Sequence, residues 1–323
     1  MTSGRAAVRL VATAGPHEGR GHVGRALAVA EALAGLGARS EIRLIRGGLT
    51  PAQASYANDL GIAIRPLSGG TETDVTYFDL PNPNEATADV EGARTAVMDD
   101  RDVFAGQANL VIQPSQPSWT GPGRADRVLE GYGMAPISAE YRRLRAAPRR
   151  DRDSSGERHV VACFGGADPA RVSQRLVDAL AGTGAQVDII IGASYEGSTD
   201  GWPIDPIRDP DDLPERLAAA DVAVLAAGTM KFEAACLGLP ALLVAVADDQ
   251  LRAGPPFAAT GVADYLGDGR LIPPSAVVDA LAALLRDDAR REAMGRRAAE
   301  LIDGRGAERI ARALLDLAEN SGR

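Results

Sequence analysis

The residues with the clearest chemical potential stand in a short loop rich in glycine. Gly19, Gly21 and His22 lie between Ala7 to Thr13, an apolar stretch that predicts a strand, and Val23 to Leu36, where apolar residues recur at helical spacing. Glycine lets the backbone approach a ligand closely, and the positive end of a helix dipole favours a neutral imidazole. His22 is therefore a candidate general base, with a simple helix cap as the alternative interpretation.

A second candidate region is a predicted strand, glycine turn, helix and strand. The apolar runs Asp221 to Ala226 and Leu239 to Ala247 predict two buried parallel strands, and a helix is expected from Thr229 to Leu237. The turn would lie at the carboxyl ends of the strands, where open α/β sheets bind ligands. Free N–H groups at Gly228 and Thr229 would suit a phosphate or diphosphate.

Four polar side chains accompany this turn. Lys231 is the only lysine of the chain, and it would either touch a phosphate as a point charge or be a solvated side chain of the first helical turn. Glu233 would either accept from sugar hydroxyls or be solvated. Asp249 and Gln250 stand just past the second strand, a place for side chains that contact a sugar.

Two further strand ends carry candidate residues. Gly165 and Gly166 follow an apolar stretch and form a second glycine loop that should face the same way as the Gly228 loop. Asp99 and Asp100 follow a predicted strand at Arg94 to Met98, so their carboxylates would either orient a histidine or a sugar, or cap the next segment. We expect a site role for Asp99 and a capping role for Asp100.

The elements that must position these residues form two α/β halves. The 323 residues suffice for two domains, and a charged stretch predicts a linker at 146–157 between domains 1–145 and 158–303, with the C-terminal helix, 304–323, crossing back onto the first. Other strands are expected at Glu41 to Arg46, Gly61 to Pro66, Asp74 to Leu80, Asn109 to Gln113, His159 to Phe164 and Gln186 to Ile191. Helices are expected at Thr50 to Leu60, Ala170 to Ala181, Asp211 to Ala220, Pro274 to Leu285, Asp288 to Asp303 and Ala307 to Ala318, and a loop at Pro114 to Gly133.

Composition excludes several classes of partner. A net charge of −9 and an aromatic share of 4% argue against nucleic acid and anionic lipid. Cys163 and Cys236 lie in apolar segments without CxxC spacing, which predicts buried thiols in a reducing compartment and no zinc site. With no signal peptide or membrane-spanning stretch expected, the sequence predicts a cytoplasmic protein. The oligomeric state stays open.

Five short motifs, in the same order, resemble those of PseG-type UDP-sugar hydrolases, relatives of the MurG-like glycosyltransferases with the two-domain GT-B fold. They are Gly19 to Arg25 (GxGHxxR in the family), Val97 to Asp100 (IDD), Ile137 to Arg145 (GPxYxxLR), Phe164 to Pro169 (FGGSDP) and Ala226 to Gln250 (AAGTTxxE, LGLP and AENQ). The resemblance covers nearly the whole chain. It implies a GT-B protein of the α/β class, with two Rossmann-like domains facing across a cleft.

The resemblance also implies roles for the residues at the motif positions. His22 would be the base for the water that attacks the anomeric carbon and displaces UDP with inversion, without a metal or other cofactor. The diphosphate would lie on Gly228 and Thr229, and the ribose on Glu233. The remaining positions expected to contact substrate or nucleotide are Gly19, Gly21, Arg25, Asp99, Gly165, Gly166, Met230, Lys231, Asp249 and Gln250.

Three departures from the family pattern leave the sugar open. Met230 to Phe232 replace the small hydroxyl and aromatic residues usual in the signature. Asp249 stands where the family usually has Asn, which exchanges an amide for a charged acceptor. The segment from Val75 to Glu85 lacks the clear Asp-x-Tyr motif, of which Tyr77 would be the remnant.

Three functions fit these observations. The first is hydrolysis of a UDP-linked amino sugar, in the biosynthesis of a nonulosonic-acid-like, surface or secondary-metabolite sugar. The second is an inverting glycosyltransferase in which His22 deprotonates an acceptor hydroxyl. The third is a nucleotide-sugar binding protein without turnover. A transferase often carries a basic or apolar membrane-facing patch, so the net charge of −9 and the short first domain favour the hydrolase.

Overall fold

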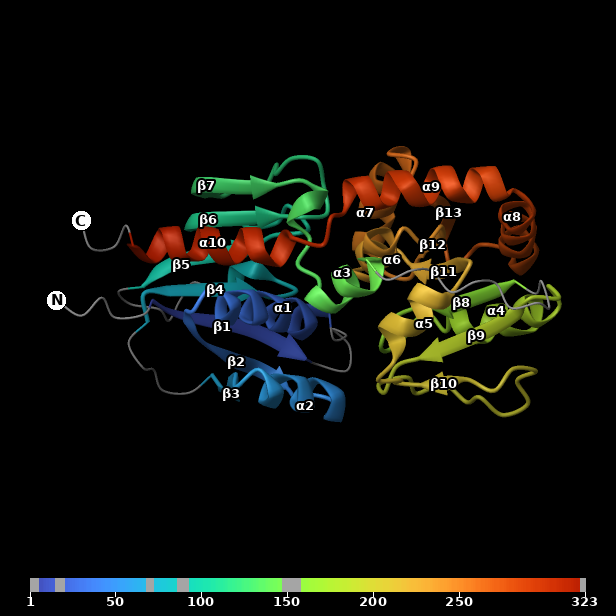
Figure 1. The fold of residues 1–323 in the computed structure, drawn as a ribbon, viewed down its shortest axis with the longest axis horizontal. Coiled ribbons are helices and arrows are strands. Elements are labelled where there is room, and N and C mark those ends of the chain that lie inside the picture. Colours follow the sequence, from blue (N-terminus) through green and yellow to red (C-terminus); the bar gives the residue numbers. More distant parts are fainter. Residues whose placement is uncertain (1–5, 15–20, 68–72, 86–92, 147–157, 320–323) are drawn as a thin grey trace. The chain divides into compact units, whose positions relative to one another are not determined.

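The chain folds into two compact α/β units. The computed structural model describes residues 6–14, 21–67, 73–85, 93–146 and 158–319. One unit comprises Met1–Ala139 together with Gly304–Arg323, and the other comprises Glu140–Asp303. Each is built on its own parallel sheet with packed helices (Figure 1), which confirms the predicted class of two Rossmann-like units.

The first unit contains a seven-stranded parallel sheet in the order β3-β2-β1-β4-β5-β6-β7. The order reverses beside β1, and α1 follows β1 in the chain, so the start of α1 belongs to a switch point of the sheet. The strands are β1 (Ala7–Ala14), β2 (Arg39–Gly47), β3 (Ala63–Pro66), β4 (Val75–Asp79), β5 (Arg94–Met98), β6 (Gln107–Gln113) and β7 (Arg124–Glu130).

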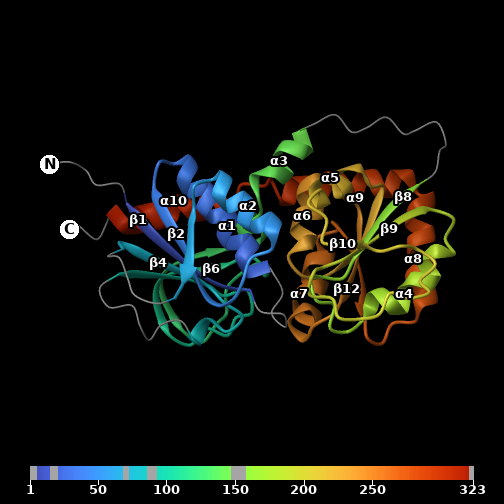
Figure 2. The same ribbon diagram turned by 90° about the horizontal axis from the view of Figure 1, so that it is seen from below.

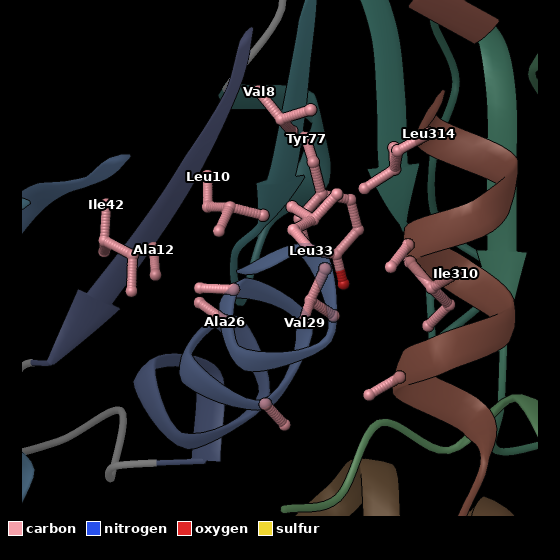
Figure 3. Close-up of a cluster of buried hydrophobic side chains, with 14 of the residues drawn as sticks. Val8, Leu10, Ala12, Ala26, Val29, Leu33, Ile42, Tyr77, Ile310 and Leu314 are labelled. Atoms are coloured by element: carbon pink, nitrogen blue, oxygen red, sulfur yellow. The ribbon is translucent and has the colours of Figure 1, made fainter. Parts of the chain in front are cut away.

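Two helices cover one face of this sheet. α1 (Gly21–Gly35) and α10 (Gly306–Glu319) lie side by side, and the sheet residues Leu10 and Tyr77 point toward them (Figure 3). Leu33 of α1 and Leu314 of α10 are fully buried in the same core. The remaining helices of the unit are α2 (Pro51–Asp59), capped by Thr50, and the short η1 (Pro83–Glu85) and η2 (Tyr132–Met134).

The alternate residues of the same strands form a second core on the other face of the sheet. Phe78 of β4 and Val97 of β5 are buried there, against Phe104 from the loop after β5. Successive residues of a strand point to opposite faces, so Tyr77 and Phe78 fix the direction of every other side chain on β4. The same alternation assigns a face to each residue at the end of β5.

The second unit contains a six-stranded parallel sheet in the order β10-β9-β8-β11-β12-β13. Its strands are β8 (His159–Cys163), β9 (Gln186–Ile191), β10 (Ile207–Arg208), β11 (Val222–Ala226), β12 (Ala241–Ala245) and β13 (Asp264–Asp268). Its helices are α3 (Ala139–Ala146), α4 (Val172–Ala181), α5 (Leu213–Ala219), α6 (Met230–Leu237), α7 (Asp248–Ala259), α8 (Pro274–Arg286) and α9 (Asp288–Leu301). α4 and α8 lie on one side of the sheet and α5 and α6 on the other (Figure 2).

Several elements differ from the sequence expectation, among them α3, which was not predicted. β7 lies within Pro114 to Gly133, which was expected to be a loop, because it is an exposed edge strand with no apolar run. The short β10 and the edge strand β13 were also not predicted. α7 was missed because Pro255 and Pro256, which normally end a helix, lie inside it.

The boundary between the units lies earlier than expected. It falls after Ala139, so α3 belongs with the second unit and not with a domain 1–145. Arg145 of α3 donates to the backbone oxygen of Ile302 at 3.1 Å, a contact within that unit. The predicted linker at 146–157 lies almost entirely outside the described residues. Within the described residues, every helix is too short or too polar to cross a membrane.

Candidate functional site

In the first unit, His22 lies in a compact cluster of charged side chains. His22 and Arg25 stand three residues apart in the first turn of α1, on one face of the helix. His22 Nδ1 is 2.7 Å from Asp79 Oδ1. Arg25 donates from Nε to Asp79 Oδ2 at 2.9 Å and from Nη2 to Asp79 Oδ1 at 2.6 Å. Its Nη1 donates to Asp100 Oδ2 at 2.6 Å.

These contacts determine which nitrogen of the imidazole carries the proton. An ionised carboxylate only accepts, so the contact with Asp79 requires a proton on His22 Nδ1. Arg25 Nη2 lies 3.0 Å from the same nitrogen because both donors converge on Asp79 Oδ1. The neutral ring therefore carries its lone pair on Nε2, and 13% of the side chain is exposed to solvent. His22 can accept a proton from a group outside the protein.

The pleat of the strands explains which carboxylates reach α1. Tyr77 of β4 and Met98 of β5 point into the core beneath α1 and α10. Side chains two residues apart along a strand share a face, so Asp79 continues the row of Tyr77 toward α1, and Asp100 lies in the turn that follows β5. Both therefore meet Arg25 at the carboxyl ends of neighbouring strands.

Asp99 points to the opposite face and has a structural role. Its carboxylate accepts from the backbone N–H groups of Val103 and Phe104, each at 3.0 Å, and from Trp119 Nε1 at 2.8 Å. Only 1% of Asp99 is exposed. The expectation for this pair is thus reversed: Asp99 caps the next loop, and Asp100 lies in the charged cluster.

Asp79 was not among the residues expected from the sequence, and it is fully buried beneath His22 and Arg25. A signal was present, because an acid at the end of a buried strand, two residues after Tyr77, must face the same helix. Burial lowers the pKa of Arg25, but the negative charges of Asp79 and Asp100 outweigh it and raise the pKa overall. Burial, supported by the charge of Asp79, also raises the pKa of Tyr77 well above its ordinary value.

In the second unit, Gly228 and Thr229 form the expected turn between β11 and α6. Gln250 lies beside this turn: its Oε1 accepts from the N–H of Val246 at 3.0 Å. A methyl group built on Gly228 would come within 3.3 Å of Gln250 Nε2, so the absence of a side chain at Gly228 keeps the turn open next to this amide. The structure therefore brings together the glycine turn and Gln250.

Lys231 is neither a solvated side chain nor one that reaches outward. Only 3% of it is exposed. Its Nζ donates to the backbone oxygens of Ala227 at 3.0 Å and Gly228 at 3.3 Å, and it lies 4.3 Å from the ring centroid of Phe232. The expectation of a solvated side chain is therefore wrong, and contact with a phosphate stays a prediction. The inward orientation follows from the tendency of helical side chains to point toward the N-terminus.

Glu233 is partly buried and hydrogen-bonded, so the expectation of a solvated carboxylate is wrong. Burial raises its pKa to about 7, while a hydrogen bond from the Tyr141 hydroxyl opposes this rise. The Glu233 charge contributes in turn, after burial, to the raised pKa values of Tyr141 and of the Cys163 thiol. Glu233 is thus held by α3 on one side, one helical turn beyond the glycine turn.

The second glycine loop is fixed by backbone geometry. Gly165 has φ +96°, a conformation that favours glycine. A methyl group on Gly192, after β9, would clash with the backbone oxygen of Gly166, so these two loops touch. Asp168 closes the loop by accepting from the N–H groups of Val172 at 2.9 Å and Ser173 at 2.8 Å.

The other expected site residues are distributed as follows. Gly21 begins α1, Met230 begins α6, and Asp249 stands partly exposed in the first turn of α7. Gly19 lies outside the described residues. Among the described residues, no three or more His, Cys, Asp or Glu side chains are grouped so as to hold a metal ion.

Comparison of the sequence with known proteins gives one partial match. The chain is 29% identical over 113 residues to the spore coat polysaccharide biosynthesis protein SpsG of Bacillus subtilis strain 168. The match covers 35% of this chain and 33% of the relative, so it spans about a third of the length of each. No protein-family model matches the chain.

Comparison of the structure gives matches over nearly the whole chain. MurG of Acinetobacter baumannii superposes with a TM-score of 0.62 at 16% identity, covering 97% of this chain and 99% of its own. The glycosyltransferase SsfS6 of Streptomyces sp. SF2575, in complex with thymidine diphosphate, gives a TM-score of 0.58 at 13% identity, covering 97% of this chain and 100% of its own. At such identities the likeness shows the fold, which is that of the GT-B glycosyltransferases.

Proposed function

We propose that the protein hydrolyses a UDP-linked amino sugar at the bond between the anomeric carbon and the β-phosphate oxygen. The observation that carries this proposal is the 2.7 Å contact between His22 Nδ1 and Asp79, which leaves Nε2 as the proton acceptor. A water-activating base requires an imidazole that is held in a fixed orientation. Asp79 is the residue that orients it, as a carboxylate does for other catalytic histidines.

The reaction balances without a further reagent. His22 Nε2 takes a proton from water as the water oxygen forms a bond to the anomeric carbon. The bond from that carbon to the β-phosphate oxygen breaks, and its electron pair leaves with UDP. Attack from the side opposite to UDP inverts the configuration of the sugar, and the proton passes from His22 to solvent.

Arg25 and Asp100 complete the support of the base. Arg25 forms ion pairs with both Asp79 and Asp100. Because the guanidinium is fixed by these two carboxylates, the Asp79 carboxylate that contacts His22 cannot rotate freely. This fixed geometry lowers the reorganisation needed at the moment of proton transfer. Arg25 is therefore assigned a positioning role and not contact with the sugar.

The second unit would hold the leaving group. The amides of Gly228 and Thr229 would receive the diphosphate, and Glu233 would accept from the ribose hydroxyls. The glycine loop at Gly165 and Gly166 opens at a neighbouring strand end, and Gln250 and Asp249 add polar atoms beyond β12. UDP is a good leaving group, so amides that stabilise its charge supply much of the catalysis.

A second candidate function is transfer of the sugar to an acceptor hydroxyl. The observation that favours it is that the structural relative SsfS6 is named a glycosyltransferase and contains thymidine diphosphate. The partial relative SpsG is named for polysaccharide biosynthesis, which fits both functions. In this alternative, His22 removes the proton of the acceptor instead of that of water.

The test is release of UDP from a panel of UDP-amino sugars, without acceptor and with EDTA, in water enriched in oxygen-18. Hydrolysis at the sugar carbon predicts free UDP without the label. Labelled UDP would place the cleavage at phosphorus and contradict the mechanism. Release only after addition of an acceptor would establish the transferase, and the cleaved member of the panel would identify the sugar.

A further inference from the structure

Lys231 lies beside the proposed nucleotide site, and the mechanism above does not use it. It is the second residue of α6 and the only lysine of the chain. Its side chain runs back toward the N-terminus of the helix and is buried beneath the turn. The ring centroids of Phe232 and Phe257 lie 4.3 Å and 5.8 Å from Nζ, so the ammonium group makes cation–π contacts with both rings.

This placement sets a cation close to the positive end of a helix. A cation at the N-terminal end of a helix meets the positive end of the dipole, and burial removes much of its hydration. Local rules of this kind are broken mostly at functional sites. An anion on the outer side of the turn would compensate both positive charges, that of the helix end and that of Lys231.

The contacts of Lys231 also determine where the neighbouring amides point. In a trans peptide the C=O and N–H groups point in opposite directions, and the described residues contain no cis peptide bond. Lys231 binds the C=O groups of Ala227 and Gly228. The N–H groups of the same two peptides, those of Gly228 and Thr229, therefore point away from the lysine.

These two amides are available to a ligand. Within the described part of the chain, neither the N–H of Gly228 nor that of Thr229 donates to another protein group. We propose that Lys231 is a positioning residue for the nucleotide diphosphate: it holds two carbonyls inward so that two amides face the phosphates, and it places a positive charge beneath them. This inference rests on the proposed nucleotide site and explains how that site is held.

A lysine suits this role better than an arginine. The ammonium group is a compact point charge that fits beneath a single turn, whereas a planar guanidinium presents five donors in a wider fork. Lys231→Met keeps the length and the apolar stem of the side chain but removes the charge and both hydrogen bonds. Arg296→Met, on the exposed surface of α9 in the same unit, is the matched control for loss of one positive charge.

The experiment compares three probes by calorimetry or NMR titration: UDP, inorganic pyrophosphate and uridine. Lys231→Met is expected to bind UDP and pyrophosphate at least tenfold more weakly than the wild type, with uridine affinity unchanged, and Arg296→Met should match the wild type. UDP affinity within twofold of the wild type would overturn the inference. Equal loss for uridine would also overturn it, because a collapsed turn weakens all three probes alike.

Two further outcomes keep the inference separate from the function it rests on. If the wild type binds neither UDP nor pyrophosphate, the proposed nucleotide site itself is wrong. If the wild type binds UDP and Lys231→Met binds it equally well, only the role of Lys231 is refuted.

A second measurement does not depend on the variant folding. Because the chain contains one lysine, labelling lysine with carbon-13 at Cε gives a single side-chain signal from the wild-type protein. Saturation with pyrophosphate is expected to shift this signal, since the phosphates would lie on the other side of the same two peptides. An unmoved signal at proven saturation would contradict the inference.

Discussion

Replacing Glu233 by Gln tests the electrostatics of the second unit without any ligand. The folded protein holds the pKa of this carboxyl at about 7 because burial disfavours its charge, against an ordinary value of 4.5. The unfolded chain therefore loses this proton first as the pH rises. Between pH 4.5 and 7 the folded state retains a proton that the unfolded state has lost, so unfolding becomes easier across this window.

The size of the effect follows from the two pKa values. The interval from 4.5 to about 7 corresponds to at most about 3 kcal/mol of stability, and the partial exposure of Glu233 reduces this to about 1–3 kcal/mol. Glu233→Gln has no proton to lose. The unfolding free energy of the variant relative to the wild type should therefore increase by this amount between pH 4.5 and 8.

The assay is urea-dependent hydrogen exchange of the amides of β11 and β12, which reads the second unit alone. Glu215→Gln, on the exposed surface of α5, controls for loss of one negative charge in the same unit. Tyr141→Phe removes the hydrogen bond that opposes the raised pKa, so it should move the window to higher pH. A difference between Glu233→Gln and the wild type that stays constant from pH 4.5 to 8 would refute the reasoning.

Three other predictions can be tested with single variants. Asp79→Asn removes the carboxylate that accepts three hydrogen bonds and so takes a buried charge partner from Arg25. Thermal unfolding should therefore show the first unit destabilised by about 3–5 kcal/mol. A loss of stability below about 1 kcal/mol would contradict the ion-pair account. UDP affinity, measured by calorimetry, should increase from pH 6 to 8 as Glu233 ionises. If the affinity does not change with pH, or changes equally in Glu233→Gln, contact between Glu233 and the ribose is ruled out. Gly192→Ala should displace the loop at Gly166 and weaken UDP binding; unchanged affinity would remove that loop from the site.

Much of the fold could be predicted because its buried elements have simple patterns. β9 is found over the predicted residues, and β11 and β12 lie within their predicted apolar runs. Edge strands such as β7 lack that pattern, because much of the strand is exposed to solvent and polar residues alternate irregularly with apolar ones. α7 contains two prolines, and helix-ending residues within a helix are tolerated only through tertiary packing that the local sequence does not express.

The candidate site was predictable at the level of loops and less so at the level of side chains. Glycine spacing located the start of α1 at His22 and the turn at Gly228. The roles of Asp79, Asp99 and Asp100 depend on the register of the pleat, which becomes visible only when the core face of each strand is known. The inward orientation of Lys231 depends on burial, because the same residue on an exposed helix would extend into solvent.

The most direct test of the central claim is the single-turnover rate of UDP release by the wild type and by His22→Ala, without acceptor. The substrate is the UDP-amino sugar of the panel that the wild type cleaves. UDP binding is measured for both proteins, so that a loss of rate is not confused with a loss of affinity. The account predicts that His22→Ala binds UDP as the wild type does but releases it from the sugar at least a hundredfold more slowly, in line with the usual contribution of a general base of about 10²–10⁴. Equal rates for the two proteins would show that His22 is not the base.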